Sequence, residues 1–184
     1  MNSKTPGGVT MSDAAGLEPL SVLANRVGAI LRERRQTVAV AESSAGGLVS
    51  AALLAIPGAS AFFLGSAVVY SRRAAKALLG LTAEDMAGMR AETEPYASFI
   101  AGRIRGSHRA TWGIAESGAA GPSGSPYGDA PGHVCVAVAG EAAASRTIET
   151  ADADRASNMD VFARQLLLLF HQTLLAQDRR APGS

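Results

Sequence analysis

Two serines followed closely by two glycines, in the segment Glu42-Ser43-Ser44-Ala45-Gly46-Gly47, could support nucleophilic chemistry. An apolar run precedes the segment and a helical pattern follows it, which predicts a strand-to-helix turn. The first N–H groups of a helix lack internal partners, and glycine lets a ligand approach the backbone closely. The turn could therefore present Ser43 or Ser44 as a nucleophile, with Gly46 and Gly47 beside an anion. The alternative is an ordinary helix cap, for which serine is preferred.

A tyrosine and a lysine form the second candidate group. Tyr70 ends another apolar run, and Lys76 follows in a segment with helical character. A serine hydroxyl is a weak nucleophile and needs an adjacent base, which a desolvated lysine can provide. A tyrosine near both groups could relay the proton. The alternative is a tyrosine that packs its ring at the rim of a sheet.

A glycine- and proline-rich segment, residues 118–132, is the third candidate. A loop of about 15 residues without regular structure is uncommon inside a compact domain and is often functional. Its glycines could form a backbone nest for phosphate or carboxylate. The segment lacks the lysine of a Walker loop and does not match a dinucleotide-binding fingerprint. A passive surface loop is the alternative.

The elements that must position these groups alternate between helix and strand. We expect helices at 20–35, 48–55, before 105 and 154–177, and strands at 37–41, within 61–70, and at 111–115, 133–139 and 145–149. Glu94-Pro95 predicts a helix start. The order predicts an α/β fold, a three-layer sandwich with a mixed β-sheet flanked by helices. We expect one domain over 17–178, a disordered segment at 1–16 and a flexible tail at 179–184.

Composition narrows the class of protein. Seventeen basic and sixteen acidic residues give a net charge of +1, which argues against a nucleic-acid partner. The lone cysteine, Cys135, lies in an apolar run, which predicts a buried structural thiol and a reducing compartment. No apolar stretch reaches the length of a membrane span, and the N-terminus has no secretory pattern. We therefore expect a cytoplasmic protein with no membrane partner.

Four segments together resemble signatures of the CinA C-terminal domain family, whose stand-alone members are nicotinamide-nucleotide amidohydrolases. The family motifs are similar to Ala-Glu-Ser-Cys-Thr-Gly-Gly, Tyr-Ser-Asn-Glu-Ala-Lys, Ser-Glu-Pro and Ser-Gly-Ile-Ala-Gly-Pro. The matching segments here are 41–47, 70–75, 93–95 and 117–122. They occur in the family's order and at similar separations, and the likeness spans roughly residues 18 to 177.

The resemblance implies hydrolysis of the carboxamide of nicotinamide mononucleotide, which releases ammonia and nicotinate mononucleotide. It implies that Ser43 is the nucleophile, that Tyr70 and Lys76 move its proton, and that glycine-rich turns hold the phosphate. The substrate-binding residues that it implies are Ser44, Gly46, Gly47, Ser117, Gly118, Ala119, Gly121 and Arg155. It implies a small-molecule amide or nucleotide as partner, self-association into a homo-oligomer, and neither a metal nor a cofactor.

Several positions depart from the family pattern. Ala75 occupies the place of the family lysine, and Lys76 follows one residue later, which is about 100° of rotation on a helix. Ser44-Ala45 replaces Cys-Thr, and Asp129 and Met159 stand where the family has basic residues. Three hypotheses follow: an amidohydrolase for the mononucleotide or a related amide, a non-catalytic nucleotide- or partner-binding protein, and an amidase for an unphosphorylated amide.

Overall fold

The computed structural model describes residues 16–179, which form a five-stranded mixed sheet in the order β2-β1-β3-β4-β5. All but one residue of each predicted flexible end lies outside the described range. The strands are β1 (Val38–Glu42), β2 (Phe63–Val68), β3 (Trp112–Ala119), β4 (His133–Ala139) and β5 (Ala144–Glu149). β1 pairs in parallel with β2 and β3, whereas β3, β4 and β5 pair antiparallel.

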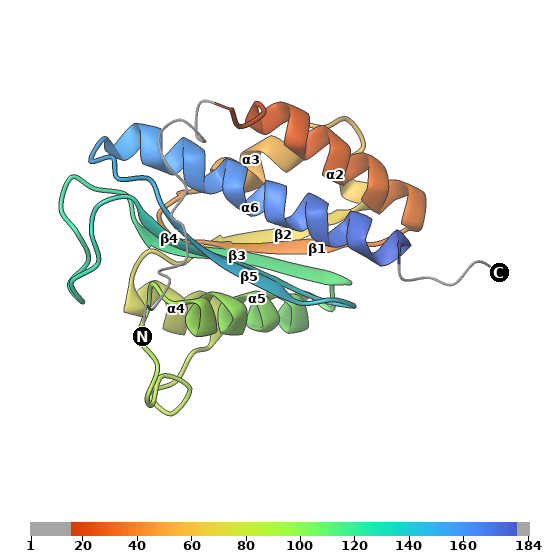
Figure 1. The fold of residues 1–184 in the computed structure, drawn as a ribbon. Coiled ribbons are helices and arrows are strands. Elements are labelled where there is room, and N and C mark those ends of the chain that lie inside the picture. The colour runs from red at the N-terminus through yellow and green to blue at the C-terminus, as the bar shows by residue number, and fades with distance from the viewer. Residues whose placement is uncertain (1–15, 180–184) are drawn as a thin grey trace, which may run out of the picture.

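Helices cover both faces of the sheet. They are α2 (Leu20–Arg34), α3 (Leu48–Leu54), α4 (Arg72–Leu79), α5 (Glu94–His108) and α6 (Arg155–Asp178), with a short 3₁₀ turn at Ala59–Ala61. α2, α3 and α6 lie on one face, and α4 and α5 lie on the other (Figure 1). The predicted three-layer α/β sandwich with a mixed sheet is confirmed. None of the helices between residues 16 and 179 is long and apolar enough to cross a membrane.

The two faces of the sheet pack differently. Large side chains, including Trp112, Phe162 and Phe170, fill the core under α2, α3 and α6. Small side chains, among them four strand alanines, dominate the core under α5. Gly113 of β3 allows the closest approach, because a Cβ added there would lie 2.0 Å from the carbonyl oxygen of Ala101 in α5. The alanine- and glycine-rich composition thus brings α5 close to the sheet.

Local capping signals fix the starts of the two helices on this face. The Ser71 hydroxyl accepts the N–H of Ala74 at 3.1 Å and caps α4. The Thr93 hydroxyl accepts the N–H of Tyr96 at 3.4 Å, and α5 begins at Glu94 with a proline in its first turn. The helix start predicted from Glu94-Pro95 is therefore confirmed.

The third strand is longer than predicted. We expected it to end at Ala115 and the glycine-rich loop to begin at Gly118, but β3 continues to Ala119. The strand β4 pairs along this whole length, down to Ala119 opposite His133. Glycine at position 118 permits this pairing, because a Cβ there would lie 2.4 Å from the carbonyl oxygen of His133 and would clash with it. The expected loop therefore starts at residue 120.

The turns after β1, β2 and β3 leave the sheet at one edge, because these three strands run parallel. In open α/β sheets, ligands bind outside the carboxyl ends of such strands. All three candidate groups predicted from the sequence therefore gather at this edge. Cys135, on β4, is buried as predicted.

Candidate active site

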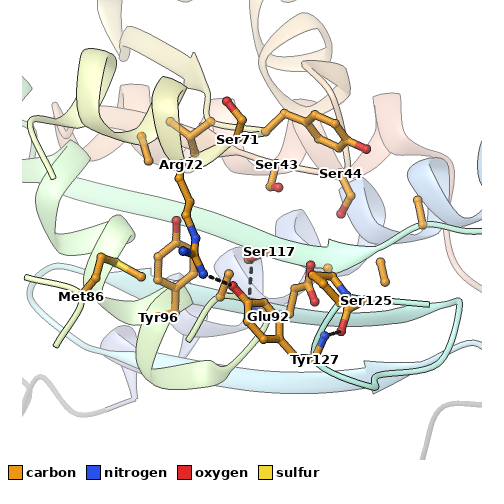
Figure 2. Close-up of a pocket in the computed structure, with 18 of the residues that line it drawn as sticks. Ser43, Ser44, Ser71, Arg72, Met86, Glu92, Tyr96, Ser117, Ser125 and Tyr127 are labelled. Carbon is orange, nitrogen blue, oxygen red and sulfur yellow. Dashed lines mark hydrogen bonds between the residues drawn. The ribbon is translucent and has the colours of Figure 1, made fainter. Parts of the chain in front are cut away.

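A pocket of about 920 Å³ lies at the carboxyl edge of the parallel strands. Its walls come from the turns after β1, β2 and β3, from the start of α4 and from the segment that precedes α5 (Figure 2). Nine residues predicted for the site line it: Ser43, Ser44, Tyr70, Lys76, Ser117, Gly118, Ala119, Gly121 and Arg155. Gly46 and Gly47, which were also predicted to bind substrate, are not among the lining residues.

The two adjacent serines have different surroundings. The Ser44 hydroxyl donates to Oε2 of Glu116 at 2.8 Å. The Ser43 hydroxyl faces the pocket and hydrogen-bonds no residue that the structure describes. The cap of α3 is Gly47, without a side-chain hydrogen bond, so the helix-cap alternative for either serine is wrong. Of the two serines, Ser43 is the one whose hydroxyl has no hydrogen-bond partner among the described residues.

The side chain that holds the serine turn is Glu116 of β3. Its carboxyl group accepts the N–H of Ser43 at 2.5 Å and that of Ala45 at 2.8 Å, besides the Ser44 hydroxyl. Burial, with a smaller contribution from nearby Glu42, outweighs the lowering effect of these hydrogen bonds and raises the pKa of Glu116 to about 7. The backbone around Ser43 is therefore held by a group that titrates near neutral pH.

A second buried carboxylate, Glu42, occupies the start of α3. It accepts the N–H groups of Gly47 at 2.9 Å, Val49 at 3.1 Å and Ser50 at 2.9 Å, and the hydroxyl of Ser50. These N–H groups are the ones that we expected to receive an anion. The protein's own carboxylate uses them instead, so the expected anion site at this helix start is wrong.

Arg155 joins two of the predicted segments. One guanidinium nitrogen donates to the phenol oxygen of Tyr70 at 3.2 Å, and the other donates to the carbonyl oxygen of Gly121 at 2.8 Å. The guanidinium also lies 5.8 Å from the centroid of the Tyr70 ring. Tyr70 itself is 63% exposed and lies beyond the end of β2, not within it. The pocket therefore has a cation at its mouth.

Lys76 and Ala75 lie on different sides of α4, as the rotation of about 100° between consecutive helical residues predicts. Ala75 is only 4% exposed and lines the pocket from its buried side. Lys76 is exposed and also lines the pocket, but it makes no hydrogen bond or ion pair within residues 16–179. The structure thus brings the ammonium to the pocket without joining it to Ser43.

Four further lining residues, Arg72, Glu92, Tyr96 and Tyr127, were not predicted for the site. Arg72, the first residue of α4, donates to the phenol oxygen of Tyr127 at 3.0 Å. Tyr96 is buried at the start of α5, and burial raises its pKa. The only sequence signals for these residues were their places next to the Tyr70 and Glu94-Pro95 motifs and within the glycine-rich loop.

Comparison with known proteins identifies relatives of this chain. A CinA-like protein from Desulforapulum autotrophicum is 34% identical over 152 residues, which are 82% of this chain and 36% of that protein. A CinA-like protein from Synechococcus sp. (strain CC9902) is 43% identical over 111 residues, 60% of this chain and 26% of that protein. This chain therefore spans only about a quarter to a third of the length of these relatives.

Solved structures share the fold. A competence-damaged protein (CinA) superfamily protein from Klebsiella pneumoniae has a TM-score of 0.80 at 26% identity, covering 86% of this chain and 99% of that chain. A competence or damage-inducible protein from Enterobacter asburiae has a TM-score of 0.79 at 28% identity, covering 85% of this chain and 99% of that chain. Residues 20–174, nearly the whole described fold and all of the pocket lining, match the family model of the CinA C-terminal domain. The chain belongs to the CinA C-terminal domain family.

Proposed function

We propose that this protein is a serine amidohydrolase that releases ammonia from the carboxamide of nicotinamide mononucleotide or of a related small amide. One observation carries the proposal: the Ser43 hydroxyl faces a large pocket without a hydrogen bond to any described residue, although its own N–H is fixed by Glu116. An unengaged hydroxyl on a fixed backbone is the arrangement that a nucleophile requires.

In the proposed reaction, Ser43 Oγ attacks the amide carbon while its proton passes to Lys76, directly or through the phenol of Tyr70. The C–N bond then breaks, and the departing nitrogen takes up the proton and leaves as ammonia. Water hydrolyses the resulting ester, which yields the carboxylic acid and restores the Ser43 hydroxyl. Lys76 and Tyr70 are assigned to proton transfer because both line the pocket with Ser43.

The pocket also supports a nucleotide-sized substrate. A volume of about 920 Å³ lies within the usual range for small-molecule sites, which is roughly 300–1,000 Å³. Arg72 and Arg155 line it and supply positive charge for a phosphate. These cations compensate in part for the basic family positions that are Asp129 and Met159 here.

The test is ammonia release from nicotinamide mononucleotide by three proteins: the unaltered chain, Ser43→Ala and Ser44→Ala. We expect Ser43→Ala to lower kcat by about 10³-fold or more, because it removes the attacking atom. Ser44→Ala is the matched control: it removes a neighbouring hydroxyl that is bound to Glu116, and it should keep kcat within about threefold while losing about 1–2 kcal/mol of stability. Equal turnover by Ser43→Ala and the unaltered chain would exclude Ser43 as the nucleophile.

A second candidate function, nucleotide binding without catalysis, is favoured by Ala75 at the buried position and by the exposed Lys76. In that case nicotinamide mononucleotide should raise the melting temperature of the unaltered chain and of Ser43→Ala equally, with no ammonia released. Hydrolysis of nicotinamide riboside in preference to the mononucleotide would instead identify an amidase for unphosphorylated amides.

A further inference from the structure

Arg72, the first residue of α4, brings a positive charge to the pocket and stands where the family motif has asparagine. Its guanidinium donates from Nη2 to the phenol oxygen of Tyr127 at 3.0 Å, and it forms no ion pair and no other hydrogen bond within residues 16–179. Figure 2 shows this guanidinium between the rings of Tyr96 and Tyr127. Because an arginine has five N–H donors, most of those of Arg72 are available to a ligand.

The other arginine of the pocket lining is already used within the protein. Arg155 donates to the phenol oxygen of Tyr70 and to the carbonyl oxygen of Gly121. These two bonds join the end of β2 to the glycine-rich loop. Arg155 therefore has a bracing role, and Arg72 is the arginine with more unused donors.

The acidic residue of the lining does not neutralise Arg72. Glu92 forms no ion pair with Arg72 in the part of the chain that the structure describes. Burial raises the pKa of the Glu92 carboxyl group, and the cations that act on this group are His133 and Arg90. One of its oxygens, Oε2, is buried. The charge of Arg72 therefore remains available on the pocket side.

Two phenol groups next to Arg72 can donate protons to the same ligand. The Tyr127 oxygen accepts from Arg72 and donates to no described residue, so its own proton is free. The phenol of Tyr96 makes no hydrogen bond within residues 16–179, although the residue is only 6% exposed. Burial raises the pKa of Tyr96, so this phenol keeps its proton at neutral pH. A cation flanked by two hydroxyl donors is suited to an anion with several oxygens.

The position of Tyr127 is fixed by contacts of the glycine-rich loop. Arg90 lies 5.3 Å from the centroid of the Tyr127 ring and pairs with Asp129 at 2.6 Å. The Ser125 hydroxyl donates to Asp129 at 2.6 Å and accepts the N–H of Tyr127 at 3.1 Å. Asp129 stands where the family has a basic residue, and its contacts here support Tyr127. They hold the phenol against Arg72.

From this geometry we infer that Arg72, Tyr96 and Tyr127 form a phosphate-binding subsite, in which Arg72 sets the preference for phosphorylated over unphosphorylated amides. The inference rests on the proposed amidohydrolase function and assigns the residues that hold one end of its substrate. A phosphate monoester carries a charge of about −1.5 to −2 at neutral pH and three acceptor oxygens. A guanidinium can bind two of these oxygens, and the phenols can donate to the third. A ribose hydroxyl has no charge for Arg72 to balance.

The test compares nicotinamide mononucleotide with nicotinamide riboside, which lacks the phosphate. Calorimetry on the Ser43→Ala variant measures binding without turnover, and we expect the mononucleotide to bind about 10–100-fold more tightly than the riboside. Adding Arg72→Gln should reduce this ratio to about threefold or less and change riboside binding by about twofold or less. The matched control is Arg73→Gln, which removes the same charge from the next residue of α4, exposed and outside the pocket lining, and should preserve the ratio.

The phenol groups are tested separately. Tyr96→Phe and Tyr127→Phe each keep the ring and remove one donor, so each should weaken mononucleotide binding by about 3–10-fold without changing riboside binding. Equal losses for the two ligands in these variants and in Arg72→Gln would identify structural roles and would overturn the assignment.

Other outcomes would also overturn the subsite. These are equal binding of the two ligands by the Ser43→Ala protein, binding of neither, an equal loss in Arg73→Gln, or a ratio that survives Arg72→Gln but is lost in Arg155→Gln. If ammonia is released in a Ser43-dependent reaction while Arg72→Gln leaves the ratio unchanged, the subsite fails and the proposed function stands. If the mononucleotide binds through Arg72 but releases no ammonia, the proposed function fails and the subsite stands.

Discussion

The turn that carries Ser43 and the helix that carries Lys76 face the same pocket but are held in different ways. Two fully buried carboxylates, Glu42 and Glu116, accept hydrogen bonds from the turn and from the start of α3. Helix α4 has eight residues, most of them exposed, and one side-chain cap at Ser71. The difference teaches that the fold fixes the position of Ser43, the proposed nucleophile, far more firmly than that of Lys76, its proposed base.

The largest effect is expected at Glu42. Replacing Glu42 with alanine should lower the free energy of unfolding by about 3–5 kcal/mol, because several buried donors lose their common acceptor. Urea denaturation measures this change. Glu33→Ala, at an exposed position of α2, is the control and should change the stability by about 0.5 kcal/mol or less. A loss at Glu42 no larger than the loss at Glu33 would contradict the firm anchoring of the turn.

Glu116 should make the stability depend on pH. Burial raises the pKa of its carboxyl group to about 7, from 4.5, so the folded protein binds this proton more tightly than the unfolded chain. The contribution is fully present below about pH 4.5 and is lost as the pH rises through 7, which amounts to about 3 kcal/mol. Urea midpoints between pH 4.5 and 8 should therefore fall more steeply for the unaltered protein than for Glu116→Gln. Parallel curves for the two proteins would show that Glu116 does not titrate in this range.

The smallest effect is expected in α4, the less firmly held of the two regions. The double substitution Ala75→Lys with Lys76→Ala moves the amine to the buried side of α4, where desolvation favours its neutral, basic form, and it should raise kcat for amide hydrolysis by about tenfold. The control is Ala75→Met with Lys76→Ala, which adds a chain of similar length without an amine. If both double variants have the same kcat, the location of the lysine does not limit the reaction.

The sequence predicted the elements of the fold and the edge of the sheet at which the site lies. A continuous apolar run marks β1, and the Glu94-Pro95 signal marks the start of α5. The length of β3 could not be predicted, because its last residues are in a strand only through their pairing with β4. A polar, glycine-containing segment has no strand pattern of its own.

The carboxylates around the site were harder to predict. Glu42 and Glu116 follow the paired residues Ala41 and Ala115 on adjacent strands, so their closeness depends on a register that periodicity does not reveal. Glu92 adopts a positive φ that its residue type disfavours. Only the contacts of its backbone with Ser117 and His133 explain this conformation.

The close approach of α5 to β3 ties the position of a pocket residue to a contact outside the pocket. A methyl group at Gly113 would meet the Ala101 carbonyl at 2.0 Å, so it would force the helix outward. Tyr96, in the first turn of that helix, lines the pocket and would move with it. A mutational search for altered substrate preference should therefore include this glycine, although it does not line the pocket.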